Sequence, residues 1–242
     1  PDVTDGLLVF VRAEKAAEPS LSGPRVLIEG GLGVGRVTRP GLEQEVGQAA
    51  INRVPRRMIR DGVLEMCEKY GYRGSIKVTV SVPGGEETAK KTFNPRLGIE
   101  GGLSILGTTG IVEPMSEKAL TDTLYLEMKM IRESGCLRCF VTPGNYGSDF
   151  LQKELSADPR LCVKCSNYVG EAIDFGKILG MKGILLVGHI GKFIKLAAGV
   201  MNTHSRQADC RMEVLASHAA LAGAGQKTVE RIMNCINTSE AA

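Results

Sequence analysis

The chain has 242 residues, of which 43% are hydrophobic and 24% are charged, a balance typical of a globular protein with one large or two small domains. A net charge of +3 and the lack of Trp argue against a general nucleic-acid binder, whereas a basic pocket for a small polyanion stays open. No apolar run approaches the roughly 18 residues of a membrane span, no signal peptide is visible, and seven scattered Cys suit a reducing cytoplasm.

The first part of the chain mixes strand and helix patterns. Apolar positions from Ile59 to Tyr70 recur at helical spacing, and Gly71 closes that helix. Residues 76–82 alternate between apolar and polar side chains, which predicts a half-buried strand of an antiparallel or mixed sheet. With further strands at 7–11 and 25–28, we expect an α+β domain over residues 1–112.

A glycine-rich turn at residues 30–35 superficially offers a dinucleotide-binding fingerprint. The GxGxxG pattern fails because Arg36 stands where the third Gly belongs, and Pro40 and Gly41 prevent a helix directly behind the turn. The alternative is a tight turn, or a wall of a substrate site formed by closely packed backbone.

From Glu113 onward, strand and helix patterns alternate. Strands are expected at 137–141, 161–165 and 184–187, and helices at 113–134, 150–155, 168–179 (with Ser166 or Asn167 as cap), 205–221 and 227–236. This alternation predicts a Rossmann-like domain over residues 113–242, a parallel sheet with helices on both faces. The fold class is therefore two-domain, α+β followed by α/β. Ligands of such sheets bind beyond the carboxyl ends of the strands.

One strand, glycine turn and helix unit, residues 183–198, is the strongest candidate for a ligand site. The turn Gly188-His189-Ile190-Gly191-Lys192 would aim free helix N–H groups at the crevice above the strand end, a position that favours anions. It is not a Walker A turn, because its first Gly lies too close and Phe193 replaces the Ser or Thr that binds magnesium. A purely structural turn is the alternative.

Polar side chains crowd the segment that follows. Asn202, His204, Arg206 and Asp209 could hold a ligand in a charge-assisted network, or could only cap the next helix. In the first case, Arg206 or His204 would contact a carboxylate and Asp209 would orient one of them. His204 would also be a candidate weak base.

Two Cys-x-x-Cys pairs, Cys136 with Cys139 and Cys162 with Cys165, suggest a zinc site at first sight. Cys139, Cys162 and Cys165 fall in expected strands, and Cys136 directly precedes one. Positions i and i+3 of a strand point to opposite faces, and neither pair contains the turn that a zinc knuckle needs. Buried, inert cysteines are the favoured interpretation, and no protein-bound metal is expected.

Several long stretches resemble one family, the cobalt-precorrin-5B C1-methyltransferases of anaerobic cobalamin biosynthesis, called CbiD. They are PDVT (1–4), GGLGVGRVTRPGL (30–42), AINRVPRRMI (50–59), NPRLGIEGGLSILGTTGIVEPMSEKAL (94–120), GNYG (144–147) and VGHIGKFIKLAAGVMNTHSRQAD (187–209). The resemblance covers nearly the whole chain in the same order. Family members carry a further segment upstream, so a missing upstream segment is expected here.

The resemblance implies a cytoplasmic enzyme that transfers a methyl group from S-adenosyl-L-methionine to ring carbon C1 of cobalt-precorrin-5B, giving cobalt-precorrin-6A. Its partner would be a cobalt corrin that carries many carboxylates, and no binding to nucleic acid or to a membrane is expected. The methyl group would move by direct in-line displacement, with positioning and charge complementarity supplying most of the rate acceleration. The candidate residues are, for catalysis, His204 and Asp209; for the cofactor, Gly144, Asn145, Gly188, His189 and Gly191; and for the substrate, Asp2, Thr4, Thr108, Thr109, Lys192, Asn202 and Arg206.

Two functions from other classes remain open. A non-catalytic carrier for an anionic tetrapyrrole would use the same cleft, and a nucleotide-dependent enzyme would use the glycine turns. Transfer of a labelled methyl group separates all three.

Overall fold

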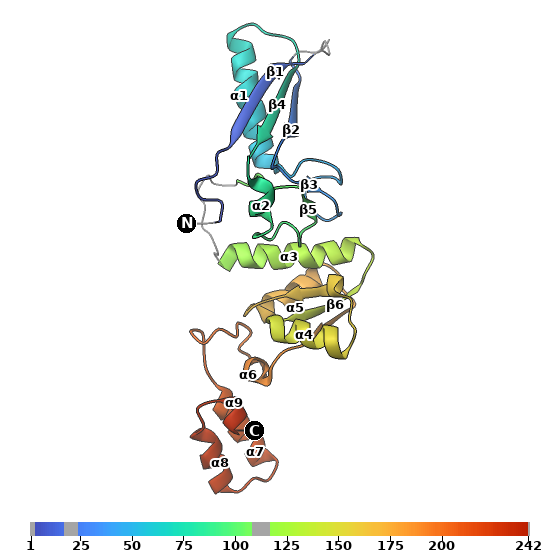
Figure 1. Cartoon of the computed structure of the whole chain (residues 1–242). Coiled ribbons are helices and arrows are strands. Elements are labelled where there is room, and N and C mark those ends of the chain that lie inside the picture. Colours follow the sequence, from blue (N-terminus) through green and yellow to red (C-terminus); the bar gives the residue numbers. More distant parts are fainter. Residues whose placement is uncertain (1–2, 17–23, 108–116, 242) are drawn as a thin grey trace. The chain divides into compact units, whose positions relative to one another are not determined.

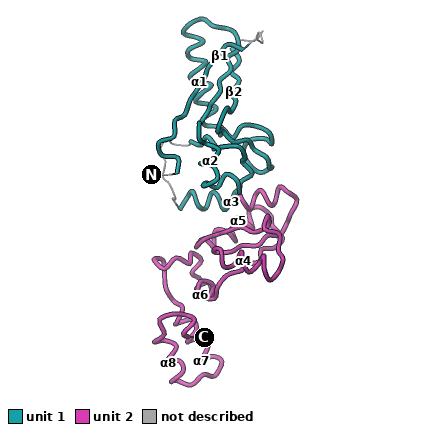
Figure 2. The backbone as a smooth tube through the Cα atoms, viewed as in Figure 1, with its two compact units in different colours: residues 1–126 teal, residues 127–242 magenta. Residues whose placement is uncertain are grey.

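The structure is a computed structural model that describes residues 3–16, 24–107 and 117–241 (Figure 1). The chain forms two compact units, residues 1–126 and 127–242 (Figure 2). This division lies within helix α3, Glu117–Glu133. The boundary expected from the sequence, between residues 112 and 113, falls outside the described residues and stays a prediction.

The first unit is organised around strand β4, Ile76–Ser81, at the centre of a three-stranded sheet. Strand β1, Phe10–Lys15, pairs with it antiparallel and strand β2, Val26–Gly30, pairs with it parallel, so the sheet is mixed, as predicted. Val78 and Val80 are buried, which confirms the alternating pattern. Strand β1 was expected at residues 7–11 but lies at residues 10–15. Its pairing with β4, and not the apolar run in the sequence, determines where the strand begins and ends.

Helix α1, Arg53–Lys69, lies beside the strands of this sheet (Figure 1). The expected apolar side is confirmed in part: Cys67 is buried and Ile59 and Val63 are half-buried, whereas Met66 and Tyr70 are exposed. It is followed by Gly71 at φ 62°, a left-handed conformation that Gly adopts without strain. The Arg56 guanidinium donates hydrogen bonds to the carbonyl oxygens of Ile28, Ala49 and Ile51 at 2.8–3.1 Å. One side chain therefore ties the start of α1 to strand β2 and to the loop before the helix.

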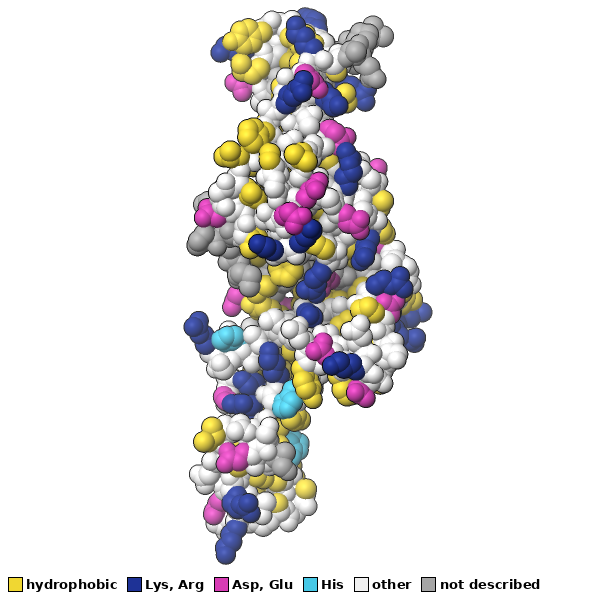
Figure 3. All heavy atoms as spheres, viewed as in Figure 1, with side chains coloured by type: hydrophobic (Ala, Val, Ile, Leu, Met, Phe, Trp, Pro, Cys, Tyr) yellow, Lys and Arg dark blue, Asp and Glu magenta, His cyan; other side chains and the backbone are white. Residues whose placement is uncertain are grey.

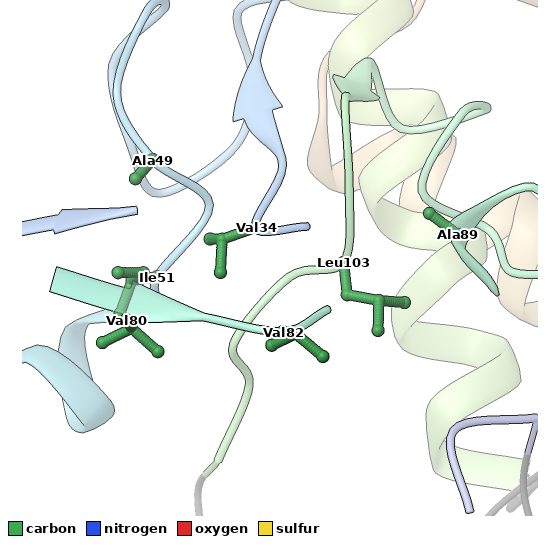
Figure 4. Packing of buried hydrophobic residues seen from close by; sticks show 7 residues of the cluster. All are labelled: Val34, Ala49, Ile51, Val80, Val82, Ala89 and Leu103. Carbon is green, nitrogen blue, oxygen red and sulfur yellow. The ribbon is translucent and has the colours of Figure 1, made fainter. Parts of the chain in front are cut away.

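The glycine turn at residues 30–35 packs backbone against backbone. A Cβ on Gly33 would collide with the Val82 carbonyl, and Gly33 has φ 72°. The turn leads into the short strand β3, Arg36–Val37, which pairs with β5, Ile99–Glu100, so no helix follows and the dinucleotide interpretation is wrong. Val34 of this turn belongs to a buried hydrophobic cluster, and Ala89 of helix α2, Gly85–Ala89, belongs to it as well (Figure 4). The cluster consists of Val34, Ala49, Ile51, Val80, Val82, Ala89 and Leu103.

The second unit holds a separate parallel sheet of three strands in the order β7-β6-β8. Strand β6, Arg138–Thr142, lies in the middle, between β7, Cys162–Lys164, and β8, Gly183–Leu186. All three strands were predicted within a residue or two. Because the strands are parallel, their carboxyl ends share one edge of the sheet.

Helices follow each strand of this sheet. They are α4, Asn145–Glu154; the 3₁₀ turn η1, Pro159–Leu161; α5, Val169–Ile178; α6, Ile190–Phe193, continued by the 3₁₀ helix η2, Ile194–Ala198; α7, Arg211–Leu221; α8, Gln226–Met233; and α9, Thr238–Ala241. Two starts differ from the prediction. Helix α4 begins at Asn145 instead of residue 150, and α7 begins at Arg211 instead of residue 205.

Candidate functional site

Three loops meet where the strands of the second sheet end. We call residues 143–145, 165–168 and 187–189 the carboxyl edge; they follow β6, β7 and β8 respectively. From β6 the chain crosses to β7 on one side and then to β8 on the other. The strand order therefore reverses between β6 and β8, which is where open α/β sheets bind their ligands.

Two glycines let these loops approach closely. A Cβ on Gly147, in the first turn of α4, would collide with the Val187 carbonyl and lie 3.0 Å from Thr142 Cβ. A Cβ on Gly188 would lie 2.8 Å from Phe193 Cζ and 3.0 Å from Pro143 Cδ. The start of α4 therefore sits directly over the ends of β6 and β8. The N-cap Gly144 has no side chain to bond the first N–H groups of α4.

The Asn145 side chain joins the loop after β6 to the end of strand β7. Its Oδ1 accepts a hydrogen bond from Lys164 Nζ at 2.7 Å. Lys164 ends β7, and both side chains are exposed. The pair places an ammonium group beside the expected cofactor residues Gly144 and Asn145.

Asn167 is the hub of the second loop. Its Oδ1 accepts from Lys192 Nζ at 3.0 Å and from Thr203 Oγ1 at 3.3 Å, while its carbonyl accepts from Thr203 N at 2.9 Å. The prediction that Asn167 or Ser166 caps α5 is wrong, because the N-cap is Tyr168 and no side chain caps that helix. Asn167 instead fixes Lys192, an expected substrate residue.

His189 caps the short helix α6. Its Nδ1 accepts a hydrogen bond from Gly191 N at 3.1 Å, and its ring meets the Tyr146 ring edge-on with centroids 5.7 Å apart. The expected helix behind the glycine turn is present only as four residues followed by a 3₁₀ helix. The expected free N–H groups are therefore partly occupied, since the imidazole already holds that of Gly191.

The segment after α6 folds around Lys195. This side chain is 4% exposed, and its ammonium donates to the carbonyls of Ala208 at 2.8 Å and Thr203 at 3.4 Å. Local bonds complete the loop: Asn202 Oδ1 accepts from His204 N, and His204 Nδ1 accepts from Arg206 N, both at 3.1 Å. His204 and Arg206 are thus presented on an exposed loop that a buried cation holds.

The sequence predicts that Asp209 orients His204 or Arg206, but both of its carboxylate oxygens instead accept hydrogen bonds from Arg211. Nε of Arg211 donates to Oδ1 at 2.8 Å and Nη2 donates to Oδ2 at 2.6 Å. These hydrogen bonds lower the pKa of Asp209 to about 2, and the carboxylate lies on the surface. A group so acidic and so paired is poorly suited to proton transfer at neutral pH.

The structure brings most candidate residues of the second unit to one place. Gly144, Asn145, Gly188, His189, Gly191 and Lys192 lie at the carboxyl edge or in α6, and Asn202 is linked to it by a β-bridge to Tyr168. Thr4 belongs to the first unit, and Asp2, Thr108 and Thr109 lie outside the described residues.

Sequence reasoning missed two residues that shape this site, Lys164 and Lys195, and it placed Asn167 at a strand end as a candidate helix cap without its contacts to Lys192 and Thr203. The only available signal was for Lys195, a single cation inside the apolar run Phe193–Ala198 of α6 and η2. The ammonium groups of the three lysines Lys164, Lys192 and Lys195 donate hydrogen bonds to amide or carbonyl oxygens. Figure 3 shows Lys and Arg side chains beside His side chains on the visible face of this unit.

The cysteine pairs divide between buried and half-buried positions. Cys139 and Cys165 are buried, and burial raises the pKa of each thiol to about 11, so both are unreactive at neutral pH, as expected.

Among residues 3–16, 24–107 and 117–241, no three His, Cys, Asp or Glu side chains gather in a way that could hold a metal. In the same residues no helix combines the length and the apolar character needed to cross a bilayer.

Comparison with known families gives two matches. The family model described as CbiD matches residues 1–114, and the model described as CbiD, C-terminal domain, matches residues 202–242. The second match includes the loop that carries His204 and Arg206. Both ends of the chain are therefore similar to the same family.

Curated relatives match along the whole chain. A protein of Ruminiclostridium cellulolyticum named cobalt-precorrin-5B C(1)-methyltransferase is 52% identical over 240 residues, 99% of this chain and 61% of the relative. One of the same name from a Thermoanaerobacter species is 44% identical over 241 residues, 100% of this chain and 63% of the relative. The chain thus spans about three fifths of the length of these relatives.

A solved structure is also similar, the cobalamin biosynthesis protein CbiD of Archaeoglobus fulgidus. It is 26% identical, with a TM-score of 0.36, and the match covers 85% of this chain and 61% of that one. The two family models and the matches to relatives along the whole of this chain agree with the motifs quoted from the sequence, and the chain belongs to the CbiD family.

Proposed function

We propose that this chain is the S-adenosyl-L-methionine-dependent methyltransferase that its relatives' name describes, acting on ring carbon C1 of cobalt-precorrin-5B. The observation that carries the proposal is its 52% identity, over 99% of the chain, to a relative with that name. The site geometry supports it, because the ammonium groups of Lys164 and Lys192 bond side chains at the carboxyl edge of a parallel sheet, and His189 lies within that edge.

We place S-adenosyl-L-methionine between the ends of β6 and β8, where the strand order reverses. Right-handed crossovers in opposite directions would put α4 and α5 on opposite faces of the sheet, which makes the unit Rossmann-like. The backbone of Gly144 and Gly188 would lie against the cofactor, with Asn145, His189 and Gly191 around it. The uncapped start of α4, beside Lys164, suits its carboxylate.

The substrate contacts follow from charge. The corrin precursor carries acetate and propionate carboxylates, and Lys192 and Arg206 present cations near the carboxyl edge and on the 202–209 loop. Asn202, Thr4, Asp2, Thr108 and Thr109 remain proposed substrate contacts on the strength of the family resemblance. Cobalt enters as part of the substrate, so the proposal needs no protein-bound metal.

The reaction asks little of the protein beyond positioning. S-adenosyl-L-methionine supplies a methyl group already activated on a sulfonium, and the corrin carbon supplies the electron pair. The chain would hold the two in line, orient the carboxylates and exclude water from the crevice. A cytoplasmic location stays a prediction.

Calorimetric titration of the complete protein with S-adenosylhomocysteine tests the cofactor placement. We expect saturable binding that Gly188→Ala weakens at least tenfold, because the added methyl group would press on Pro143 and Phe193. Gly62→Ala in α1, where the added Cβ meets open space, is the matched control and should leave binding unchanged. Absence of binding to the unaltered protein would contradict the placement.

A further inference from the structure

His189 and His204 share one unusual arrangement. In each, the imidazole Nδ1 accepts a hydrogen bond from the backbone N–H two residues later, Gly191 for His189 and Arg206 for His204, both at 3.1 Å. Both side chains are exposed, which leaves Nε2, the other ring nitrogen, as the atom that each ring can offer to a ligand. The chain has three His, and these two flank the same part of the second unit.

This arrangement fixes the proton on the other nitrogen. A neutral imidazole has one N–H donor and one acceptor, and a backbone N–H can bond only to the acceptor. Since Nδ1 is the acceptor in both residues, Nε2 carries the hydrogen. Neither ring then has a free lone pair to offer, and taking up a proton at Nδ1 would break the bond that shapes its own turn.

We propose that His189 and His204 act as neutral Nε2–H hydrogen-bond donors to carboxylates bound at the carboxyl edge, and not as bases. The proposal rests on the function proposed above, which supplies carboxylates from two sources, the cofactor and the corrin periphery. For His204, the donor role takes the place of the weak-base role that the sequence suggested. Methyl transfer to an electron-rich carbon needs no base on the enzyme to activate the nucleophile.

Their surroundings favour this role. His189 lies next in the chain to Gly188 and caps the helix that carries Lys192, so a carboxylate between them would meet an N–H donor and an ammonium. His204 stands on the loop held by the buried Lys195, two residues from Arg206. Each imidazole thus has a cation close by in the chain, and its ring is oriented by the Nδ1 bond. Within the described residues neither ring bonds a carboxylate of the kind that supports a histidine base.

Nitrogen-15 NMR of the complete protein without ligand tests the tautomers directly. Two-bond proton–nitrogen correlations at pH 8 should show His189 and His204 as fixed Nε2–H forms. His218, whose ring has no hydrogen bond within the described residues, should show exchange between tautomers and serves as the internal reference. An Nδ1–H form, or free exchange, at His204 or His189 would overturn the proposal, whatever the enzyme's activity.

Kinetics of paired substitutions test the role. The variants His204→Asn and His189→Asn can keep the turn, because the Oδ1 of an Asn accepts a hydrogen bond from the N–H two residues later, as Asn202 Oδ1 does from His204 N. Neither variant has a donor at the position of Nε2. We expect His204→Asn to raise the KM for the corrin substrate at least tenfold with kcat reduced less than threefold, and His204→Gln to recover part of that loss. A base would instead lose kcat in both variants.

The two carboxylate sources are separated by binding. If His189 meets the cofactor, His189→Asn will weaken S-adenosylhomocysteine binding at least tenfold and leave the KM for the corrin substrate unchanged. The reverse pattern assigns His189 to the macrocycle. No effect on either quantity contradicts the donor role, whereas a failure of unaltered protein to bind S-adenosylhomocysteine or to methylate contradicts the proposed function instead.

Discussion

Oδ1 of Asn167 lies 3.0 Å from Nζ of Lys192, and this hydrogen bond joins the loop after β7 to the helix after β8. The same oxygen accepts from Thr203 Oγ1, which brings the start of the 202–209 loop to the same point. Three segments that are separate in sequence are therefore fixed by one amide side chain. In the proposed enzyme, that amide sets where the Lys192 ammonium meets a carboxylate.

Replacing Asn167 should weaken both the stability of the protein and its binding of the substrate. Asn167→Ala removes the acceptor of two hydrogen bonds, each with a net value of about 1 kcal/mol, so we expect a fall of a few degrees in Tm and a rise of at least fivefold in the KM for the corrin substrate. Asn234→Ala in α8, which removes a bond to the Glu230 carbonyl, is the matched control. It should lower the stability by a smaller amount and leave KM unchanged, and equal KM values for both variants would contradict this role.

Lys195 should hold the loop that carries His204 and Arg206. Lys195→Met leaves the carbonyls of Thr203 and Ala208 without their donor, and we expect a loss of about 1–3 kcal/mol in the free energy of unfolding. Trypsin should then cleave after Arg206 faster than in the unaltered protein. The exposed Lys227→Met is the control and should change stability by less than about 0.5 kcal/mol. Unchanged cleavage after Arg206 would show that Lys195 does not organise this loop.

The ion pair of Asp209 with Arg211 should give a pH-dependent stability. The pKa of Asp209 is lowered from 3.8 to about 2 by the hydrogen bonds from Arg211, so the carboxylate contributes stability that is present above pH 4 and is lost as the pH falls through 2. Because Asp209 is exposed and Arg211 is partly exposed, solvent screens the pair, and the contribution should stay below about 1 kcal/mol.

Carbon-13 NMR of the Asp209 carboxyl measures this shift directly. The titration midpoint should lie near pH 2 in the unaltered protein and return towards the ordinary value in Arg211→Gln, which cannot supply the charged, two-pronged partner. A midpoint near 3.8 in both proteins would mean that the pair does not form in solution.

Gly147 should tolerate no side chain, because α4 begins directly over the ends of β6 and β8. In Gly147→Ala the new methyl group meets the Val187 carbonyl and the Thr142 side chain, and such overpacking costs about 1–3 kcal/mol. Gly62→Ala in α1 meets open space and should be neutral or stabilising by about 0.5–1 kcal/mol. Urea unfolding of both variants gives the comparison, and equal effects would contradict the close packing at Gly147.

The elements that could be predicted are those with a strong internal pattern. The alternation along 76–82 gave β4 and its half-buried character, and the three short apolar runs of the second unit gave β6, β7 and β8 within a residue or two. The placement of candidate ligand residues at the carboxyl ends of these strands followed from the parallel topology.

The differences arise where a distant contact overrides the local pattern. Two glycines near residue 145 resemble a loop, yet α4 begins there because Gly147 allows its first turn to pack on the strand ends. The polar residues from 205 to 210 resemble a helix start, but the Lys195 ammonium binds the carbonyls of Thr203 and Ala208 and holds the segment as a loop. No spacing in the sequence indicates that Asn167 contacts Lys192 and Thr203.

The most direct test of the central claim follows the methyl group itself. The complete protein is incubated with cobalt-precorrin-5B and S-adenosyl-L-methionine labelled in its methyl group, and the corrin product is isolated. We predict one label per macrocycle, located at C1, together with an equal amount of S-adenosylhomocysteine. Tight binding of the macrocycle with no label transferred would contradict the proposed reaction and identify the chain as a carrier.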